Sequence, residues 1–468
     1  MTERRDITVD VLVVGGGVVG CAVARHLAVN TGAKVALVEA RPDVCGGTSK
    51  ANTAILHTGF DAVPGSVESR LVSRGYELLS EWAPRAGVAV EHTGALLVAW
   101  DDEQAENLPS LVKKAVANGY HHASVVDAAT VRSLEHHLGP DVRAGMLVPD
   151  EHIIDPWATP LQFARDAIAH GATLLTRFDV TRVELLGDGE HPHHTVVHSS
   201  DGRTVSASFV VNAAGLRGDA LHRMFGCTGF TIRPRRGELI VFDKLARSLV
   251  QRTILPVPTS HTKGVLIAPT VFGNVMLGPT ADDIDDIDDT ATTRAGLDGL
   301  LAKARRILPA LLDEQVTATY AGLRAATEHS DYQLSAHGDL RYVSLGGIRS
   351  TGLTASMALG EEALRLLQSI GFDSAPRSDP DQHAGEGTPV RAHESPIVCH
   401  CERITAGQIV DACTEALPAV DLDGLRRRTR ATNGRCQGFA CLGAVVDLAS
   451  RTTDTPMAHW LHTPEAQR

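Results

Sequence analysis

Cysteine, excess positive charge and long apolar runs are all scarce in this chain of 468 residues. It offers no stretch of about 20 uncharged apolar residues, so we expect no transmembrane segment. Lysine and arginine number 44 against 56 aspartates and glutamates, a formal net charge of −12. An acidic balance of this kind argues against a protein that binds nucleic acid or an anionic membrane through its overall charge.

The first 29 residues also lack the features of a secretory signal. Asp6 and Asp10 interrupt the charged part, three consecutive glycines split the apolar run, and no clean cleavage site follows. We therefore expect a cytoplasmic protein, able to associate peripherally with the inner face of the membrane. Stable disulfides are uncommon in the cytoplasm, and only 8 cysteines are present, which disfavours a disulfide framework.

What the chain does contain is typical of a globular protein. Apolar residues make up 43% and charged residues 21%. The length exceeds what one hydrophobic core serves and predicts about three domains.

The N-terminal segment DVLVVGGGVVGCAVARHLA predicts a strand, a tight turn and a helix. Gly15, Gly17 and Gly20 give the spacing G-x-G-x-x-G, in which the glycines permit the turn, the approach of a pyrophosphate and the packing of the helix. A second strand, AKVALVEA, places Glu39 at its end, where a carboxylate can hold ribose hydroxyls. The complete pattern predicts a dinucleotide site without a 2′-phosphate.

Three further segments resemble the superfamily of D-amino-acid oxidase and glycerol-3-phosphate dehydrogenase: RPDVCGGTSKANTAILHTG (41–59), ASFVVNAAG (207–215) and LGGIRSTGLTAS (345–356). The resemblance spans nearly all of residues 8–372 and implies FAD as the cofactor. A helix expected to begin near Thr354 would direct its positive end at the flavin. The implied cofactor-binding residues are Gly15, Gly17, Gly20, Glu39, Thr48, Ser49, Val180, Gly215, Gly347, Gly352, Leu353 and Thr354.

The resemblance also implies the fold class, α/β, with a Rossmann-like FAD-binding domain and an antiparallel-sheet substrate cap. The FAD-binding segments would be about 8–62, 150–225 and 335–372, and the cap about 63–149 and 226–334. Residues 373–396 are rich in proline, glycine, serine and charge and predict a linker. A small, mainly α module would occupy residues 397–455.

Within the superfamily, RPRRGELIVF, PVPTSHTKGVLIAPT and AGLRAA resemble the glycerol-3-phosphate dehydrogenase and oxidase branch. This resemblance implies that His57 is the base taking the hydroxyl proton, and that Lys263 and Arg324 are catalytic and bind the charged group of the substrate. Arg349 is a third candidate for that group. From the residues alone, His57 is one of 22 histidines, and a structural role is the commoner one.

The C-terminal module holds the four clustered cysteines, Cys399, Cys401, Cys436 and Cys441. Their pattern is C-x-C, a long gap, then C-x4-C. Zinc knuckles prefer C-x2-C pairs, and plant-type ferredoxin spacing differs as well. CHCERIT and GRCQGFAC resemble the bacterioferritin-associated ferredoxin-like domain, which implies a [2Fe–2S] cluster held by the four cysteines rather than zinc. Just before Cys436 lies a run of arginines: Arg426, Arg427, Arg428, Arg430 and Arg435. The run predicts a solvated basic helix, which we favour slightly, or else a docking surface for an acidic redox partner or a positive field that raises the potential of the cluster.

Taken together, the resemblances imply an FAD-dependent dehydrogenase of a small anionic secondary alcohol. The expected reaction converts sn-glycerol 3-phosphate to dihydroxyacetone phosphate, with electrons passing through the cluster to a partner protein or membrane quinone. L-2-hydroxyglutarate, or another 2-hydroxy acid, is the alternative substrate, because segments such as HTGFDAVPGSVESRL resemble its oxidases too. A third possibility is a flavin and iron–sulfur electron-transfer subunit without a substrate of its own.

Overall fold

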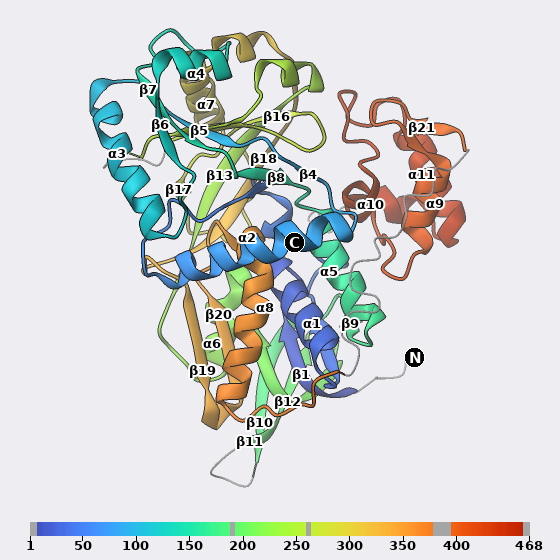
Figure 1. Ribbon diagram of the computed structural model, residues 1–468. Helices are drawn as coiled ribbons and strands as arrows, with labels where there is room; N and C mark the ends of the chain where they lie inside the picture. Colours follow the sequence, from blue (N-terminus) through green and yellow to red (C-terminus); the bar gives the residue numbers. More distant parts are fainter. Residues whose placement is uncertain (1–6, 188–191, 259–263, 378–394, 462–468) are drawn as a thin grey trace.

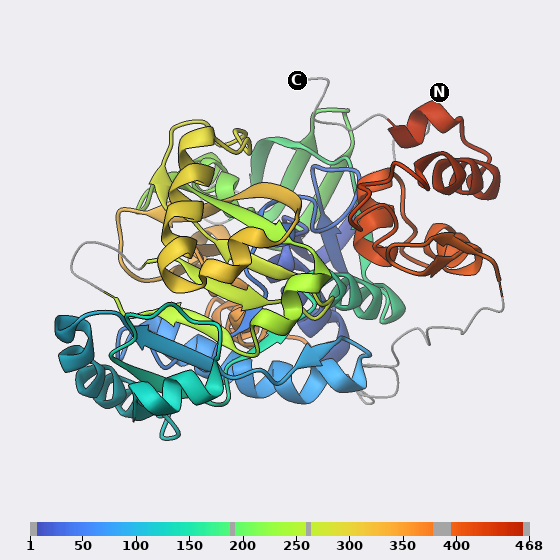
Figure 2. The same cartoon turned by 90° about the horizontal axis from the view of Figure 1, so that it is seen from above.

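A computed structural model describes residues 7–187, 192–258, 264–377 and 395–461. Figure 1 shows three parts: a nucleotide-binding domain below, a cap above it, and a small C-terminal module at one side. The view from above in Figure 2 places this module beside the body of the protein, away from the outer helices of the cap. The fold class is the expected one.

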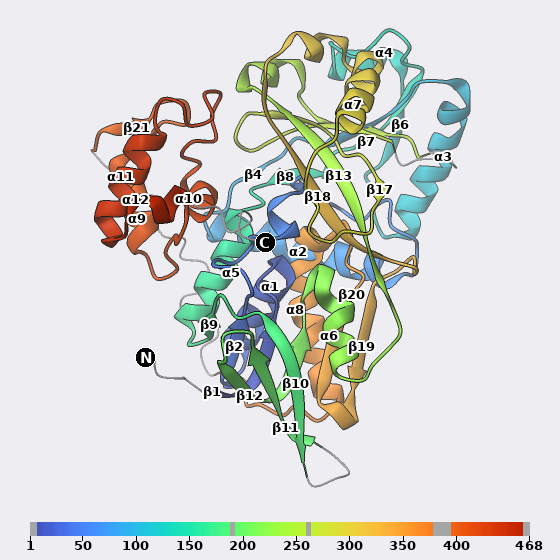
Figure 3. The same cartoon turned by 180° about the vertical axis from the view of Figure 1, so that it is seen from behind.

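The nucleotide-binding domain is built on a sheet of eight strands with the order β10-β11-β12-β1-β2-β9, and β20 and β19 continue from β12. Its central pairs, β1 with β2 and β12, β2 with β9, and β12 with β20, are parallel. The strands are β1 (Ile7–Val14), β2 (Val35–Val38), β9 (Thr173–Leu175), β10 (Val180–Gly187), β11 (Pro192–Ser199), β12 (Thr204–Asn212), β19 (Gln333–His337) and β20 (Tyr342–Gly346). Figure 3 shows this sheet from behind.

Both faces of the central strands are covered, as expected for parallel strands. Val11 and Val13 of β1 face a core shared with α1 (Val18–Asn30), α5 (Ala158–Ala169) and α8 (Gly352–Ser369). Leu12 and Val14 face the opposite core, with α6 (Gly218–Met224). The helix expected near Thr354 is therefore α8, which begins at Gly352.

The helix α2 (Val67–Arg85) crosses the start of α8. Their backbones meet at Gly75, where a Cβ would lie 2.2 Å from the carbonyl oxygen of Thr354. Only glycine fits this crossing, which presses α2 against the first turn of α8.

The cap is a nine-stranded sheet with the order β17-β13-β16-β15-β14-β5-β7-β6, and β18 pairs with β13. All its pairs are antiparallel except β5 with β14. Its strands are β5 (Ala95–Ala99), β6 (Ser124–Asp127), β7 (Ala144–Val148), β13 (Ile232–Phe242), β14 (Thr253–Pro256), β15 (Leu266–Pro269), β16 (Val275–Gly278), β17 (Asp282–Asp283) and β18 (Val316–Thr327). Its helices are α3 (Asp102–Ala117), α4 (Ala128–Leu134) and α7 (Arg294–Ile307). A small sheet of β3 (Ile55–Leu56), β8 (His152–Ile154) and β4 (Val90–Glu91) lies between cap and nucleotide-binding domain.

The C-terminal module has a core of its own, which includes Ile409, Leu425, Val445 and Trp460. Its elements are β21 (Ile397–Cys399), β22 (Ile404–Thr405), α9 (Ala406–Thr414), α10 (Leu422–Thr429), α11 (Leu442–Thr453) and α12 (Met457–Leu461). Most of the expected linker, residues 378–394, lies outside the described residues. Throughout the described ranges, no helix combines the length and apolar character needed to cross a membrane.

Two arginines of the run before Cys436 turn inward, which contradicts a solvated helix or an external docking surface at Arg427 and Arg428, whereas Arg435 is 48% exposed. The side chains of Arg427 and Arg428 are only 3% and 2% exposed. Both bind Asp43, whose carboxylate is 3% exposed: Arg427 donates over 2.7 Å, and Arg428 donates to both oxygens over 2.6 and 3.0 Å. The partner of these arginines is therefore this chain's own loop after β2, not solvent and not another protein.

Further contacts fix the module against both larger parts. Glu415 accepts two hydrogen bonds from Arg165 of α5, over 2.7 and 2.6 Å. Arg430 lies over the ring of Phe272 in the cap, 3.8 Å from its centroid, and 5.5 Å from that of Trp157. With the ion pairs of Lys50 with Asp423 and of Lys244 with Glu402, the module is anchored at several points rather than held only by a tether.

Replacing Asp43 with asparagine should loosen this docking, because it removes the carboxylate that two buried guanidinium groups share and leaves Arg427 only Asp423 and Arg428 only Glu415. Removing one partner of a buried ion pair costs about 3–5 kcal/mol. We expect faster hydrogen exchange at the amides of α10 in Asp43→Asn. The control is Asp447→Asn, which removes an exposed partner of Arg451 in the same module and should leave exchange in α10 unchanged. Equal exchange in both variants would contradict the anchoring role of Asp43.

Candidate active site and redox centre

The turn between β1 and α1 has the close packing that the glycine pattern predicts. Gly15 adopts a φ of 109°, and a Cβ there would lie 2.4 Å from the carbonyl oxygen of Ala213. A Cβ on Gly20 would lie 1.8 Å from the carbonyl oxygen of Gly15. Side chains are therefore excluded at both positions, which is the tight strand-to-helix turn of a dinucleotide site.

Glu39 stands at the end of β2, as expected, and supports this turn. One carboxylate oxygen accepts a hydrogen bond from the amide of Gly16 over 2.7 Å, and the other accepts one from the amide of Arg41 over 2.8 Å. Burial raises the pKa of Glu39 against the effect of these two amides. Each oxygen keeps a second lone pair, so these two hydrogen bonds leave Glu39 able to accept ribose hydroxyls as predicted.

The loop after β2 folds over the first turn of α1. The hydroxyl of Ser49 accepts a hydrogen bond from the amide of Val18 over 2.9 Å, and the hydroxyl of Thr48 donates to the carbonyl of Leu323 in β18 over 2.9 Å. Cys45, in the same loop, is a buried small residue. The loop therefore joins the glycine turn to the cap, at the place where the sequence predicts that it wraps FAD.

The other expected cofactor residues lie on separate segments. Gly215 and Gly347 have φ angles of 55° and 68°. Val180 opens β10, and Leu353 lies buried in the first turn of α8. The hydroxyl of Thr354 accepts a hydrogen bond from the amide of His57 over 3.0 Å, so α8 also positions the backbone of the expected base. Contact of these residues with FAD stays a prediction.

A cavity of about 1070 Å³ opens where the three parts of the protein meet. The loop after β2 lines one side, strands β16 and β18 of the cap line another, and the module contributes Arg426, Arg427, Arg430, Asn433 and Gln437. The glycine turn is not among the residues that line this cavity, so the cavity borders the loop predicted to wrap FAD rather than the turn itself. The module lines the same cavity, which places Gln437 of its cysteine loop and the loop after β2 around one space.

His57 is held by a carboxylate that the sequence did not reveal. Its Nδ1 lies 3.0 Å from an oxygen of Glu151, a fully buried residue 94 positions away along the chain. The other oxygen of Glu151 accepts hydrogen bonds from the amide of Thr58 over 2.6 Å and from its hydroxyl over 2.9 Å. With Nδ1 directed at Glu151, Nε2 of His57 is the ring nitrogen that this carboxylate does not engage.

The charge of Glu151 also changes the proton affinity of His57. Burial alone would lower the pKa of His57, but the neighbouring carboxylate of Glu151 outweighs burial and raises it. A histidine with a raised pKa is a stronger base once deprotonated, and its useful range moves toward higher pH. No spacing in the sequence signals the pair, because Glu151 lies on the turn before β8 and reaches His57 only through the pairing of β3 with β8.

The expected substrate cations differ in their surroundings. Arg324 is half-buried on β18, and burial together with the nearby Arg235 lowers its pKa. Its guanidinium donates to the carbonyl of Thr280 over 3.3 Å, and no carboxylate in the described ranges forms an ion pair with it. Arg349 instead lies 3.7 Å from Glu68 and donates to the carbonyl of Ser330. Lys263 lies outside the described residues.

The four clustered cysteines form two pairs. Cys399 is the neighbour that raises the pKa of Cys441, and Cys436 is the neighbour that raises the pKa of Cys401. Amides of Ala440, Gly438 and Phe439 donate to Cys436 and lower its pKa, whereas burial and Cys399 raise that of Cys441 to about 12. Among the described residues, these sulfurs do not gather as three or four ligand atoms within 4.8 Å of one another. Two pairs with amide donors fit a cluster of two irons better than one tetrahedral zinc.

Comparisons with known proteins agree with this architecture. Residues 10–366 match the family model for FAD dependent oxidoreductases, and residues 397–451 match the BFD-like [2Fe-2S] binding domain. The chain is 30% identical to "Glycerol 3-phosphate dehydrogenase" of Caloramator mitchellensis, over 96% of this chain and 95% of that protein. It is 26% identical to one subunit of the anaerobic glycerol-3-phosphate dehydrogenase of Escherichia coli, over 98% of this chain and 91% of that protein.

A solved structure shows the same fold around its flavin. "Dithionite reduced L-alpha-Glycerophosphate Oxidase from Mycoplasma pneumoniae with FAD bound" superimposes with a TM-score of 0.74 at 28% identity, covering 80% of this chain and 98% of that one. The glycine turn and the loop over α1 fit FAD, and the four clustered cysteines fit a [2Fe–2S] cluster, the cofactors of the two matching families. The chain belongs to the family of FAD dependent oxidoreductases and carries a BFD-like [2Fe-2S] binding domain at its C-terminal end.

Proposed function

We propose that this protein is an FAD-dependent dehydrogenase that oxidises sn-glycerol 3-phosphate to dihydroxyacetone phosphate. The observation that carries the proposal is the buried pair of Glu151 and His57, which leaves one ring nitrogen able to accept the proton of a substrate hydroxyl. The match of nearly the whole chain to a glycerol 3-phosphate dehydrogenase supports this substrate over a 2-hydroxy acid.

Bound FAD would supply a two-electron acceptor for the hydrogen of the carbinol carbon, and a [2Fe–2S] cluster held by Cys399, Cys401, Cys436 and Cys441 would supply one-electron transfer. The chain's own residues do the rest. Nε2 of His57 accepts the hydroxyl proton, Glu151 holds the ring by Nδ1, and Arg324 provides a cation for the phosphate. The expected contribution of Lys263 to the same anion belongs to this proposal.

Electrons leave through the module, whose cysteine loop adjoins the cavity. We propose a separate redox protein or a membrane quinone as the acceptor, at the inner face of the membrane. Support comes from the BFD-like domain and from a full-length relative that is named as one subunit of an enzyme.

Substrate identity is tested by anaerobic mixing of the holoenzyme with millimolar sn-glycerol 3-phosphate. We expect the flavin absorbance to bleach, followed by loss of the cluster absorbance. L-2-Hydroxyglutarate at the same concentration should bleach the flavin much more slowly. Bleaching by L-2-hydroxyglutarate alone would replace the proposed substrate, and bleaching by neither would overturn the proposal.

His57→Gln should slow flavin reduction by about 10²–10⁴-fold, the usual contribution of a general base.

Glu151→Gln tests the pair of Glu151 and His57 through the pH dependence of flavin reduction. His57 must be neutral to accept a proton, so wild-type flavin reduction should rise with pH through a pKa above the usual histidine value. In Glu151→Gln, which lacks the carboxylate, the rise of flavin reduction with pH (the acid limb of the profile) should move to lower pH. The maximal rate of flavin reduction should fall. An unmoved limb in the pH profile of Glu151→Gln would show that Glu151 does not tune His57.

Arg324→Met should raise the substrate concentration needed for half-maximal flavin reduction by at least tenfold, because a charged hydrogen bond contributes about 1.5–3 kcal/mol. Arg324→Lys keeps the charge but loses the forked geometry, so its half-maximal substrate concentration should lie between those of wild type and Arg324→Met. Arg143→Met, at an exposed arginine of the cap, serves as the matched control. If the concentration dependence of Arg324→Met matches that of the control, the phosphate is bound elsewhere.

A further inference from the structure

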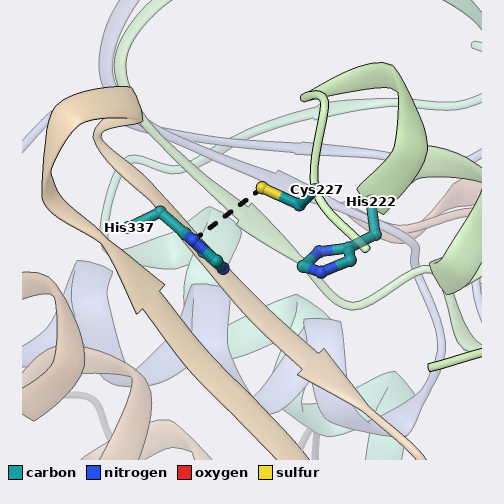
Figure 4. A group of neighbouring side chains, drawn as sticks. All are labelled: His222, Cys227 and His337. Carbon is teal, nitrogen blue, oxygen red and sulfur yellow. Dashed lines mark hydrogen bonds between the residues drawn. The ribbon is translucent and has the colours of Figure 1, made fainter. Parts of the chain in front are cut away.

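A second group of metal-binding side chains lies in the nucleotide-binding domain, separate from the four clustered cysteines. His222 belongs to α6, Cys227 to the loop that follows, and His337 ends β19. One ligand atom from each lies within 4.8 Å of the other two. Figure 4 shows the sulfur of Cys227 directed at Nδ1 of His337, 3.8 Å away, with the ring of His222 facing the same space.

The outer nitrogen of each histidine is already engaged. Nδ1 of His222 lies 3.1 Å from the hydroxyl of Tyr342, and Nε2 of His337 lies 2.9 Å from that of Ser335. This leaves Nε2 of His222 and Nδ1 of His337 to face the shared space, where a metal would compete with the hydrogen bond between the His222 ring and the backbone of Thr228. Histidines that bind metals show this arrangement, because an outer hydrogen bond fixes the tautomer and the direction of the ring.

The surroundings keep the donors neutral and ordered. His222 and Cys227 are 3% and 8% exposed, and His337 is half-buried, so the group has one side open to solvent. The ring centroid of Phe230 lies 5.1 Å from that of His222. Burial lowers the pKa of His222 and of His337, which keeps their lone pairs available at neutral pH. Burial raises the pKa of the Cys227 thiol, which a bound cation would have to reverse.

We propose that His222, Cys227 and His337 form a binding site for Zn²⁺, with a water molecule in the fourth position. Two imidazoles and one thiolate suit a borderline-soft ion that accepts tetrahedral geometry. Zinc bonds of about 2.0–2.1 Å to nitrogen and 2.3 Å to sulfur require the three atoms to move closer together by about 1 Å, within reach of small side-chain rotations. Binding replaces the thiol proton of Cys227 by Zn²⁺ and releases this proton to solvent, with no change of oxidation state.

The ion would join three segments next to the flavin loop. Phe230, which packs on His222, also fills the space over Gly346, where a Cβ would lie 2.5 Å from its ring. Gly346 ends β20 and is followed directly by Gly347 of the predicted flavin loop. A structural role for zinc, holding α6 and β19 together beneath this loop, follows from these contacts.

The test measures zinc in purified holoenzyme whose visible spectrum shows flavin and cluster intact, so that the four module cysteines are occupied. After equilibration with Zn²⁺ and removal of loosely bound metal, wild type should hold one equivalent more than Cys227→Ala or His337→Gln. His136→Gln, at an exposed histidine of the cap, should match wild type. Equal zinc in wild type and in both site variants would overturn the proposal.

Two further measurements keep the test decisive if Cys227→Ala fails to fold. Ser335→Ala leaves all three ligands in place and should weaken zinc binding by about 10–100-fold, the usual cost of losing an outer partner. In wild type, Zn²⁺ should slow alkylation of Cys227 by iodoacetamide, followed by mass spectrometry, without slowing alkylation of Cys413. Unchanged alkylation of Cys227, with unchanged affinity in Ser335→Ala, would also overturn the site.

Discussion

The placement of the C-terminal module depends on the carboxylate of Asp43, buried between the guanidinium groups of Arg427 and Arg428. Asp43 lies in the loop that crosses the start of α1, and the two arginines lie on α10, shortly before the cysteine loop. Burial opposes the charge on Asp43, yet the two arginines outweigh it and lower the pKa of the carboxyl. Together with the ion pair of Lys50 and Asp423, this contact connects the loop predicted to wrap FAD with the module predicted to hold the cluster.

This contact gives the cavity its third wall. Arg426, Arg427 and Arg430 of the module line it together with the loop after β2 and with strands of the cap. Removing the module would therefore open the cavity as well as remove the cluster. Arg427 and Arg428 of α10 dock the module within the chain. Their side chains are 3% and 2% exposed, and a charged group buried to this degree is tolerated only with a partner.

Around His57, too, a small number of contacts hold several groups in place. Thr354 of α8 holds the backbone of His57, while Glu151 holds its ring and the adjoining Thr58. The same first turn of α8 is pressed by α2 at Gly75. Cap, flavin loop and proposed base are thus fixed by one set of packed elements. Arg324, by contrast, has no carboxylate partner among the described residues and remains available for an anionic substrate.

Features whose residues lie close together in the chain could be predicted from the sequence: the glycine turn, Glu39 at the end of the second strand, the helix α8, and the cysteines of the C-x-C and C-x4-C patterns. Motifs of this kind specify backbone conformation and donor atoms directly. The cofactors and the family followed from these motifs, and the comparisons confirm them. Which distant groups meet became known from the folded chain alone. Glu151 reaches His57 across 94 residues, Asp43 reaches Arg427 and Arg428 across 384 and 385, and His337 approaches Cys227 across 110. Local spacing carries no information about such pairs, because strand pairing and domain docking bring them together.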